Sequence, residues 1–143
     1  MTIIPFSLEY QDALISMSLD AKRALGRQNP TLKPDLLDIP VNYFDKGDMF
    51  WLALDESGQL LASLGYSSIP DTTEVWLHRF YVRHDRKRQG IGSALLTHAE
   101  AYLKAQGKTC ARVHLGADYY ESHQFYPKHG YQTYAPLYMK KEL

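Results

Sequence analysis

RHDRKRQGIGSALL, from Arg83 to Leu96, is the stretch that decides the fold, because it joins two segments of different periodicity. The segment before it, TEVWLHRFYVR, is rich in β-branched and aromatic residues and predicts a strand. The segment that continues it, GIGSALLTHAEAYLKAQG, repeats apolar residues at helical spacing and ends at Gly107, which predicts a helix. The stretch therefore predicts an α/β protein with a glycine-rich turn between a strand and a helix.

Gly90 and Gly92 stand where this predicted helix begins. The first N–H groups of a helix have no partner inside the helix, and its N-terminal end carries partial positive charge. Glycine lets a backbone approach a ligand closely, and Arg86, Lys87 and Arg88 add positive charge nearby. The turn therefore predicts a site for a ligand with more than one phosphate, and a solvated basic turn is the alternative.

Two common phosphate motifs are excluded by their spelling. The Walker loop needs Gly, four residues and then Gly-Lys-Ser/Thr, and no such string occurs. The dinucleotide fingerprint needs a third Gly or Ala where this chain has Leu95. The fingerprint also needs an acidic residue about 20 positions on, at the end of the next strand, which here reads Leu115-Gly116-Ala117.

Charge and composition argue against two classes of partner. The 143 residues include 16 Lys+Arg and 16 Asp+Glu, so the broad basic surface of a nucleic-acid binder is not expected. The longest apolar run, MFWLAL at 49–54, is too short to span a bilayer, and the N-terminal MTIIPFSLEY lacks the pattern of a signal peptide. A single cysteine, Cys110, cannot form an intramolecular disulfide. We expect one domain over residues 1–143 in a reducing, cytoplasmic setting, with no nucleic-acid or membrane partner.

The periodicity and the turn residues predict the order of the other elements. Proline residues at 34 and 40 break one segment into a helical connection, and Glu56-Ser57-Gly58 marks the turn of a hairpin. The expected elements are a strand in TIIPFSLEY, a helix in YQDALISMSLDAKRALG, a broken helical connection in LKPDLLDIPVNYF, a hairpin of MFWLALDE and QLLASLGYSS, a strand in CARVHLGA, a helix in DYYESHQFYPKHG, and strands in YQTY and LYMKKEL.

Two motifs carry a resemblance to a known family. FYVRHDRKRQGIGSALL resembles the acetyl-CoA-binding segment of the GNAT N-acetyltransferases, whose loop ends in Arg/Gln-x-x-Gly-x-Gly/Ala. FYPKHGY, Phe125 to Tyr131, is similar to the family's late helix, which ends in Phe-Tyr-x-x-x-Gly-Phe/Tyr. The chain departs from the family at Lys87, where Arg or Gln is usual, and at Tyr119, where Asn or Asp is frequent. The resemblance implies an α/β fold with a mixed, mostly antiparallel sheet flanked by helices.

The resemblance further implies that acetyl-CoA is the co-substrate. By position, the backbone at 80–82 would bind the pantetheine arm, and the amides at 89–93 would hold the pyrophosphate, with two cations beside them. The coenzyme-binding residues that it implies are Phe80, Tyr81, Val82, Lys87, Arg88, Gln89, Gly90, Ile91, Gly92 and Ser93.

Acetyl transfer from a thioester to an amine requires that the amine lose a proton and that the leaving thiolate gain one. The resemblance places Tyr126 near the coenzyme sulfur as the acid, and a core tyrosine is the alternative. Strand alternation puts Glu74, Trp76, His78 and Phe80 on one face, where relatives often carry an acidic residue. His78 is the predicted base and Glu74 its reserve. The alternative is that His78 only packs.

Other reactive side chains are assigned no part in the chemistry. Cys110 lies in an apolar strand and is expected to be a core residue, and the remaining histidines lack metal-ligand spacing, so no metal site is expected. Tyr43, Phe44 and Trp51 are candidates for lining the acceptor side. The sequence thus predicts an N-acetyltransferase that acetylates a primary amine of a small molecule or peptide, as a monomer or homodimer. The alternative is a non-catalytic acyl-CoA-binding or sensing domain.

Overall fold

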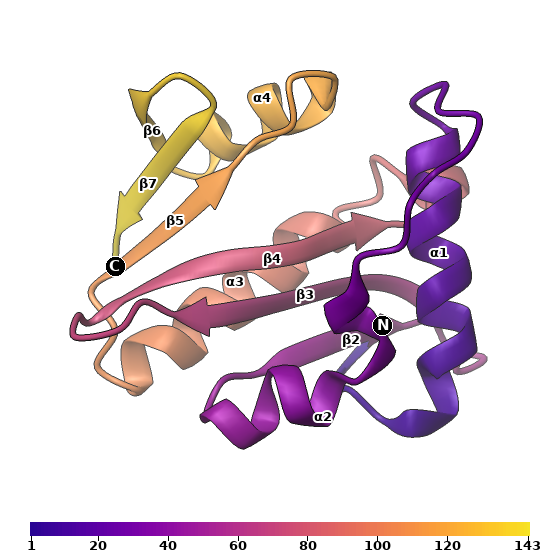
Figure 1. The fold of residues 1–143 in the computed structure, drawn as a ribbon, viewed down its shortest axis with the longest axis horizontal. Helices are drawn as coiled ribbons and strands as arrows, with labels where there is room; N and C mark the ends of the chain where they lie inside the picture. The colour runs from indigo at the N-terminus through magenta and orange to yellow at the C-terminus, as the bar shows by residue number, and fades with distance from the viewer.

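The computed structural model describes residues 1–143 and contains one seven-stranded sheet with helices on both faces (Figure 1). The strands follow the order β1-β2-β3-β4-β5-β7-β6, and every neighbouring pair is antiparallel except β4 and β5. The strands are β1 (Thr2–Pro5), β2 (Phe50–Leu54), β3 (Leu60–Ser68), β4 (Glu74–Val82), β5 (Cys110–His114), β6 (Gln132–Ala135) and β7 (Tyr138–Glu142). The helices are α1 (Gln11–Arg23), α2 (Ile39–Asn42), α3 (Ile91–Ala105) and α4 (Tyr120–Lys128), with 3₁₀ turns η1 (Leu8–Tyr10), η2 (Pro34–Leu37), η3 (Phe44–Lys46) and η4 (His84–Arg86).

The two parallel strands stay together for a short distance only. Pairing of β4 with β5 is limited to Glu74↔Cys110, Val75↔Ala111 and Trp76↔Arg112, whereas β5 pairs along its whole length with β7. Beyond Trp76 the two strands diverge, as Figure 1 shows. We call the region where residues 77–82 of β4 have left β5 the open wedge.

Each face of the sheet has its own core. The apolar face of α3 buries Leu95, Leu96, Ala99 and Leu103, and these side chains join Tyr126 of α4 in a cluster of 19 buried residues. The opposite face carries a cluster of 11 buried residues, to which α1, η2 and α2 contribute. Burying a leucine side chain stabilises the fold by about 1.5–3 kcal/mol, so these clusters fix both helical layers on the sheet.

A β-bulge interrupts β4 at Arg79. Gly65 of β3 pairs with His78 and Ser63 with Tyr81, so three residue steps on β4 face two on β3. Arg79 adopts a φ of 55°, the left-handed conformation that a side chain rarely takes. The extra residue exchanges the two faces of the strand beyond this point.

The bulge corrects the predicted face of β4. Phe80 packs against the 19-residue cluster that contains Val75 and Leu77, so it does not share a face with His78. The simple alternation expected from sequence is therefore wrong for Phe80, because that alternation includes no extra residue.

Two smaller corrections concern the N-terminal half. The first strand ends at Pro5, where the chain turns into η1. Trp51 is 2% exposed and packs against Tyr66 and Tyr102, so it is a core residue and does not line an open surface.

The α/β fold class, the mixed and mostly antiparallel sheet, and the predicted order of elements are confirmed. The segment at 34–46 is indeed a broken helical connection, made of η2, α2 and η3. No helix in the structure combines the length and the apolar character that crossing a membrane demands.

Candidate active site

The turn between β4 and α3 presents a run of unpaired backbone donors. None of the backbone N–H groups from Lys87 to Ser93 donates a hydrogen bond to another group of the protein, and the first bond of α3 runs from Ala94 N to Gly90 O at 3.0 Å. We call these groups the amide run. Successive free N–H groups at the start of a helix form a concave site for anions, which the helix dipole reinforces.

Backbone conformation gives the amide run its shape. Arg88 and Gly90 are both left-handed, with φ values of 64° and 78°. A side chain built at Gly90 would meet nothing within 4 Å, so glycine is favoured there by its conformation and not by crowding. At Gly92 an added Cβ would lie 3.5 Å from Phe125, an ordinary contact. Packing in the free protein therefore does not demand glycine at position 92.

The positive charge around the amide run is smaller than the sequence implies. Arg83 pairs with Asp85 at 2.7 Å and Lys87 pairs with Glu121 at 2.8 Å, and Arg86 lies 3.8 Å from Asp55. Arg88 forms no ion pair. Arg88 is thus the one cation of the turn without an acidic partner, and it would act together with the backbone donors on an anion.

Helix α4 is docked against the amide run through several contacts. Glu121 in its first turn binds Lys87, and His129 just after its last turn lies with Nε2 3.0 Å from Ser93 Oγ. Phe125, between them, is the side chain nearest to Gly92. The two motifs singled out in the sequence are therefore neighbours in space.

Tyr126 of α4 lies beside the open wedge. Its ring packs edge-on against Phe80 of β4, with ring centroids 6.2 Å apart, and the residue is 6% exposed. Its hydroxyl makes no hydrogen bond within the protein. Every fully buried side-chain oxygen or nitrogen atom, by contrast, has a hydrogen-bond partner. The phenolic oxygen therefore reaches the accessible surface. Burial raises the pKa of Tyr126, so the phenol is protonated at neutral pH, the form that a general acid requires.

His78 lies just beyond the last residue of β4 that pairs with β5. Its Nε2 atom lies 2.7 Å from Ser67 Oγ on β3. Burial, with a further contribution from the positive charge of Arg79, lowers the pKa of His78 to about 4. The imidazole is consequently neutral at pH 7, with a free electron pair on one of its nitrogens.

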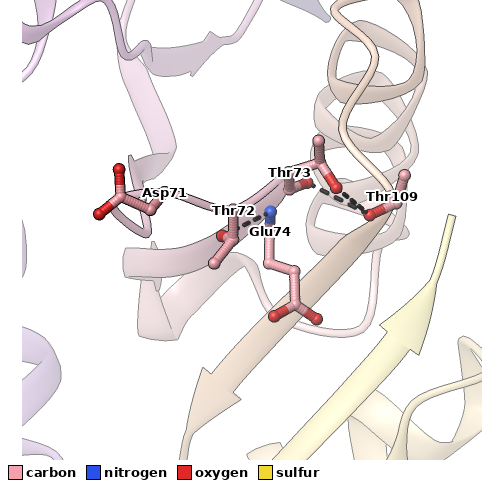
Figure 2. A pocket seen from close by; sticks show the side chains of 5 residues that line it. All are labelled: Asp71, Thr72, Thr73, Glu74 and Thr109. Atoms are coloured by element: carbon pink, nitrogen blue, oxygen red, sulfur yellow. Dashed lines mark hydrogen bonds between the residues drawn. The ribbon is translucent and has the colours of Figure 1, made fainter.

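Glu74 lies at the opposite end of β4 from the amide run. Eight residue steps along the strand separate it from Val82, a span of about 26 Å. Its carboxylate binds Arg112 at 3.1 Å, and this hydrogen-bonded ion pair holds the pKa of Glu74 below its usual range. The surface around it, shown in Figure 2, is a shallow open depression lined by polar residues only, namely Asp71, Thr72, Thr73, Glu74 and Thr109. This depression contains none of the other predicted site residues.

The opposite side of the wedge is tied to the N-terminal third by two ion pairs that sequence reasoning missed. Arg79 in the bulge binds Asp35 of η2 at 2.7 Å, and Tyr43 donates a hydrogen bond to the same carboxylate at 2.6 Å. Arg27, after α1, binds Asp118 in the turn before α4 at 2.8 Å. Partners 44 and 91 positions apart leave no local pattern in a sequence. The structure brings no group of three or more His, Cys, Asp or Glu side chains together in an arrangement that could hold a metal ion.

Comparison with known proteins agrees with this architecture. A sequence model of the acetyltransferase (GNAT) family matches residues 16–131. The fold is similar to that of an acetyltransferase of the GNAT family from Staphylococcus aureus Mu50, with a TM-score of 0.90 and 20% identity over 99% of this chain and 98% of that chain. No curated protein matches the chain in sequence.

Two further similar structures contain a coenzyme. The PaiA N-acetyltransferase from Thermoplasma acidophilum, in complex with coenzyme A, has a TM-score of 0.85 and 20% identity over 99% of this chain and 98% of that chain. A phosphinothricin acetyltransferase of the GNAT superfamily from Sinorhizobium meliloti, in complex with AcCoA, has a TM-score of 0.80 and 16% identity over 99% of this chain and 88% of that chain. At these identities the likeness concerns the fold.

Proposed function

The chain belongs to the acetyltransferase (GNAT) family, and from this premise we propose that it transfers the acetyl group of acetyl-CoA directly to a primary amine. The observation that carries the proposal is the amide run beside the open wedge, which offers unpaired donors to phosphates next to a strand edge that β5 has left. The complexes of similar proteins with coenzyme A and AcCoA support the choice of ligand.

Acetyl-CoA fits the residues present. Its pyrophosphate would bind the amides of Gln89 to Ser93, with Lys87 and Arg88 beside it. The pantetheine arm, which carries amide groups, would lie along the backbone of Phe80, Tyr81 and Val82 inside the wedge. Gly92 supports this fit. Packing within the protein leaves room for a Cβ at this position, but a ligand in contact with the backbone would collide with that Cβ.

The proposed reaction needs two proton transfers and no covalent enzyme intermediate. The amine nitrogen attacks the thioester carbonyl carbon, a C–N bond forms and the C–S bond breaks. Tyr126, protonated and without a hydrogen-bond acceptor in the protein, gives its proton to the leaving thiolate and afterwards regains a proton from solvent. The amine passes a proton towards neutral His78, beside Ser67, and from there to solvent. Glu74, tied to Arg112, is the weaker candidate for this second role.

The proposal is tested by measuring release of free coenzyme A thiol from acetyl-CoA across a panel of primary amines, with mass spectrometry of the products. We expect thiol release that depends on the amine and an equal amount of acetylated amine. Binding of acetyl-CoA without transfer to any amine would instead support the non-catalytic sensing domain. Absence of binding would reject both.

A further inference from the structure

An open cavity of about 470 Å³ lies where the chain runs from α1 to η2. One side of it is the last turn of α1, and the other is the segment that leads into Pro34. Nine residues line it, of which three, Lys22, Arg27 and Lys33, are cations and none is acidic.

Lys22 is the unusual member of this lining. The residue is 4% exposed, and its ammonium donates a hydrogen bond to the carbonyl oxygen of Thr31 but forms no ion pair. Burial lowers the pKa of Lys22, and the cations Lys33 and Arg27 add to that effect. A buried charge without a counter-ion is costly, so this ammonium would be stabilised by an anion entering the cavity.

The acids near the cavity are already engaged. Asp35, directly after Pro34, is bound by Arg79 and Tyr43, and Asp118 is bound by Arg27. Lys33 is exposed and forms no ion pair. Lys22 and Lys33 are thus the two cations of the lining that have no ion-pair partner.

The cavity is connected to both sides of the open wedge. At one end, Pro34 leads into Asp35, whose carboxylate holds Arg79 in the bulge of β4, one residue beyond His78. At the other end, Arg27 binds Asp118, which precedes α4. A ligand held in the cavity is therefore linked through these two ion pairs to β4 on one side of the wedge and to the segment before α4 on the other.

We propose that the acetyl acceptor carries a carboxylate or phosphate group in addition to its amine, and that this anionic group binds in the cavity between Lys22 and Lys33. The inference rests on the proposed transfer function and specifies its substrate class. The same cations repel polyamines and lysine-rich peptides, whose additional charges are positive.

The binding test does not depend on catalysis. Calorimetric titrations of succinate and of inorganic phosphate are made with coenzyme A at saturation, so that the amide run is occupied. Lys22→Met and Lys33→Gln remove the two cavity charges, and Lys104→Met on the exposed end of α3 is the matched control for one lost charge. We expect either variant to weaken binding of the anion about tenfold, or 1.4 kcal/mol, and the control to bind the anion as the unmutated protein does.

Binding of succinate alone assigns a carboxylate, and binding of phosphate alone assigns a phosphate. No binding at millimolar concentration, or equal binding by all variants, overturns the inference.

The turnover test uses pairs of amines that differ in their anionic group. β-Alanine is compared with β-alaninamide, and phosphoethanolamine with ethanolamine. We expect a higher kcat/KM for at least one anionic member than for its neutral counterpart, mainly because its KM is lower. Lys22→Met should lose that preference. Equal kcat/KM within both pairs rejects the anion site while leaving acetyl transfer intact. Anion binding with no acetylation of any amine rejects the transfer function while leaving the site intact.

Discussion

The Nζ atom of Lys87 lies 2.8 Å from Oε2 of Glu121, so a carboxylate of α4 neutralises one of the two cations in the amide run. Any phosphate that binds the amide run must compete with Glu121 for Lys87. Both side chains are exposed, and such a pair is worth only about 0.2–1 kcal/mol. The carboxylate of Glu121 therefore weakens anion binding slightly.

Replacing Glu121 with Gln is accordingly expected to tighten coenzyme A binding by about two- to fivefold, because Lys87 becomes available to the phosphates. Calorimetry at low ionic strength measures the effect. Asp71→Asn, the same chemical change at the far end of β4, is the control and should leave the affinity unchanged. Unchanged or weaker binding by Glu121→Gln would show that Lys87 contributes nothing to the phosphate site.

Gly90→Ala should destabilise the fold and also weaken coenzyme A binding. A Cβ in the left-handed conformation costs about 1–2 kcal/mol, and the strained turn would displace the amide run. Gly107→Ala is the matched control, since Gly107 has a φ of 80° and equally open surroundings at the other end of α3. Urea unfolding should show similar losses for both variants. Only Gly90→Ala should lose affinity, by at least about tenfold in calorimetry, and equal affinities would remove the turn from the site.

Tyr126→Phe should lower kcat at least about tenfold while leaving stability and coenzyme A affinity near those of the unmutated protein. General acid catalysis contributes about 10²–10⁴ in rate. The Tyr126 hydroxyl makes no hydrogen bond within the protein, so its removal costs little stability. Steady-state kinetics and urea unfolding measure the two effects.

Tyr131→Phe provides the opposite result for comparison. Its hydroxyl donates to Glu100 at 2.7 Å, so its loss should cost about 1.5–3 kcal/mol in the free energy of unfolding and little in kcat. Full activity in Tyr126→Phe would exclude the acid role and leave proton delivery to water.

His78 should make stability depend on pH between about 4 and 6.5. Its pKa falls from 6.5 to about 4 on folding, so the unfolded chain binds the proton more tightly in this window. Protonation then favours unfolding, and the contribution of neutral His78, up to about 3 kcal/mol, is complete above pH 6.5 and is lost as the pH falls towards 4. Urea unfolding of the unmutated protein and of His78→Gln should converge as the pH is lowered. Parallel pH profiles would show that folding does not change the proton affinity of His78.

Much of the fold follows from local patterns, and the exceptions have physical causes. The strand, glycine turn and helix at 74–105 are each coded within a few residues, so their order was predicted correctly. Trp51 was misplaced because β2 is buried on both faces and its apolar run shows no alternation. The face of Phe80 was misplaced because a bulge is defined by the number of residues on the neighbouring strand. The ion pairs of Arg79 and Arg27 join residues that are distant in sequence and meet only through tertiary packing, so no local sequence pattern predicts them.

The amide run also has a consequence for mutational mapping. Main-chain donors are shared by every residue type except proline, so alanine substitutions at Lys87, Gln89 or Ser93 leave the donors in place. An alanine scan of this turn would register only the minor contributions of the side chains. Proline at Gly92 or Ser93, in the first turn of α3, removes a single donor, and it would test the anion site where an alanine substitution does not. Proline at Arg88 or Gly90 would instead destroy the left-handed conformation of the turn.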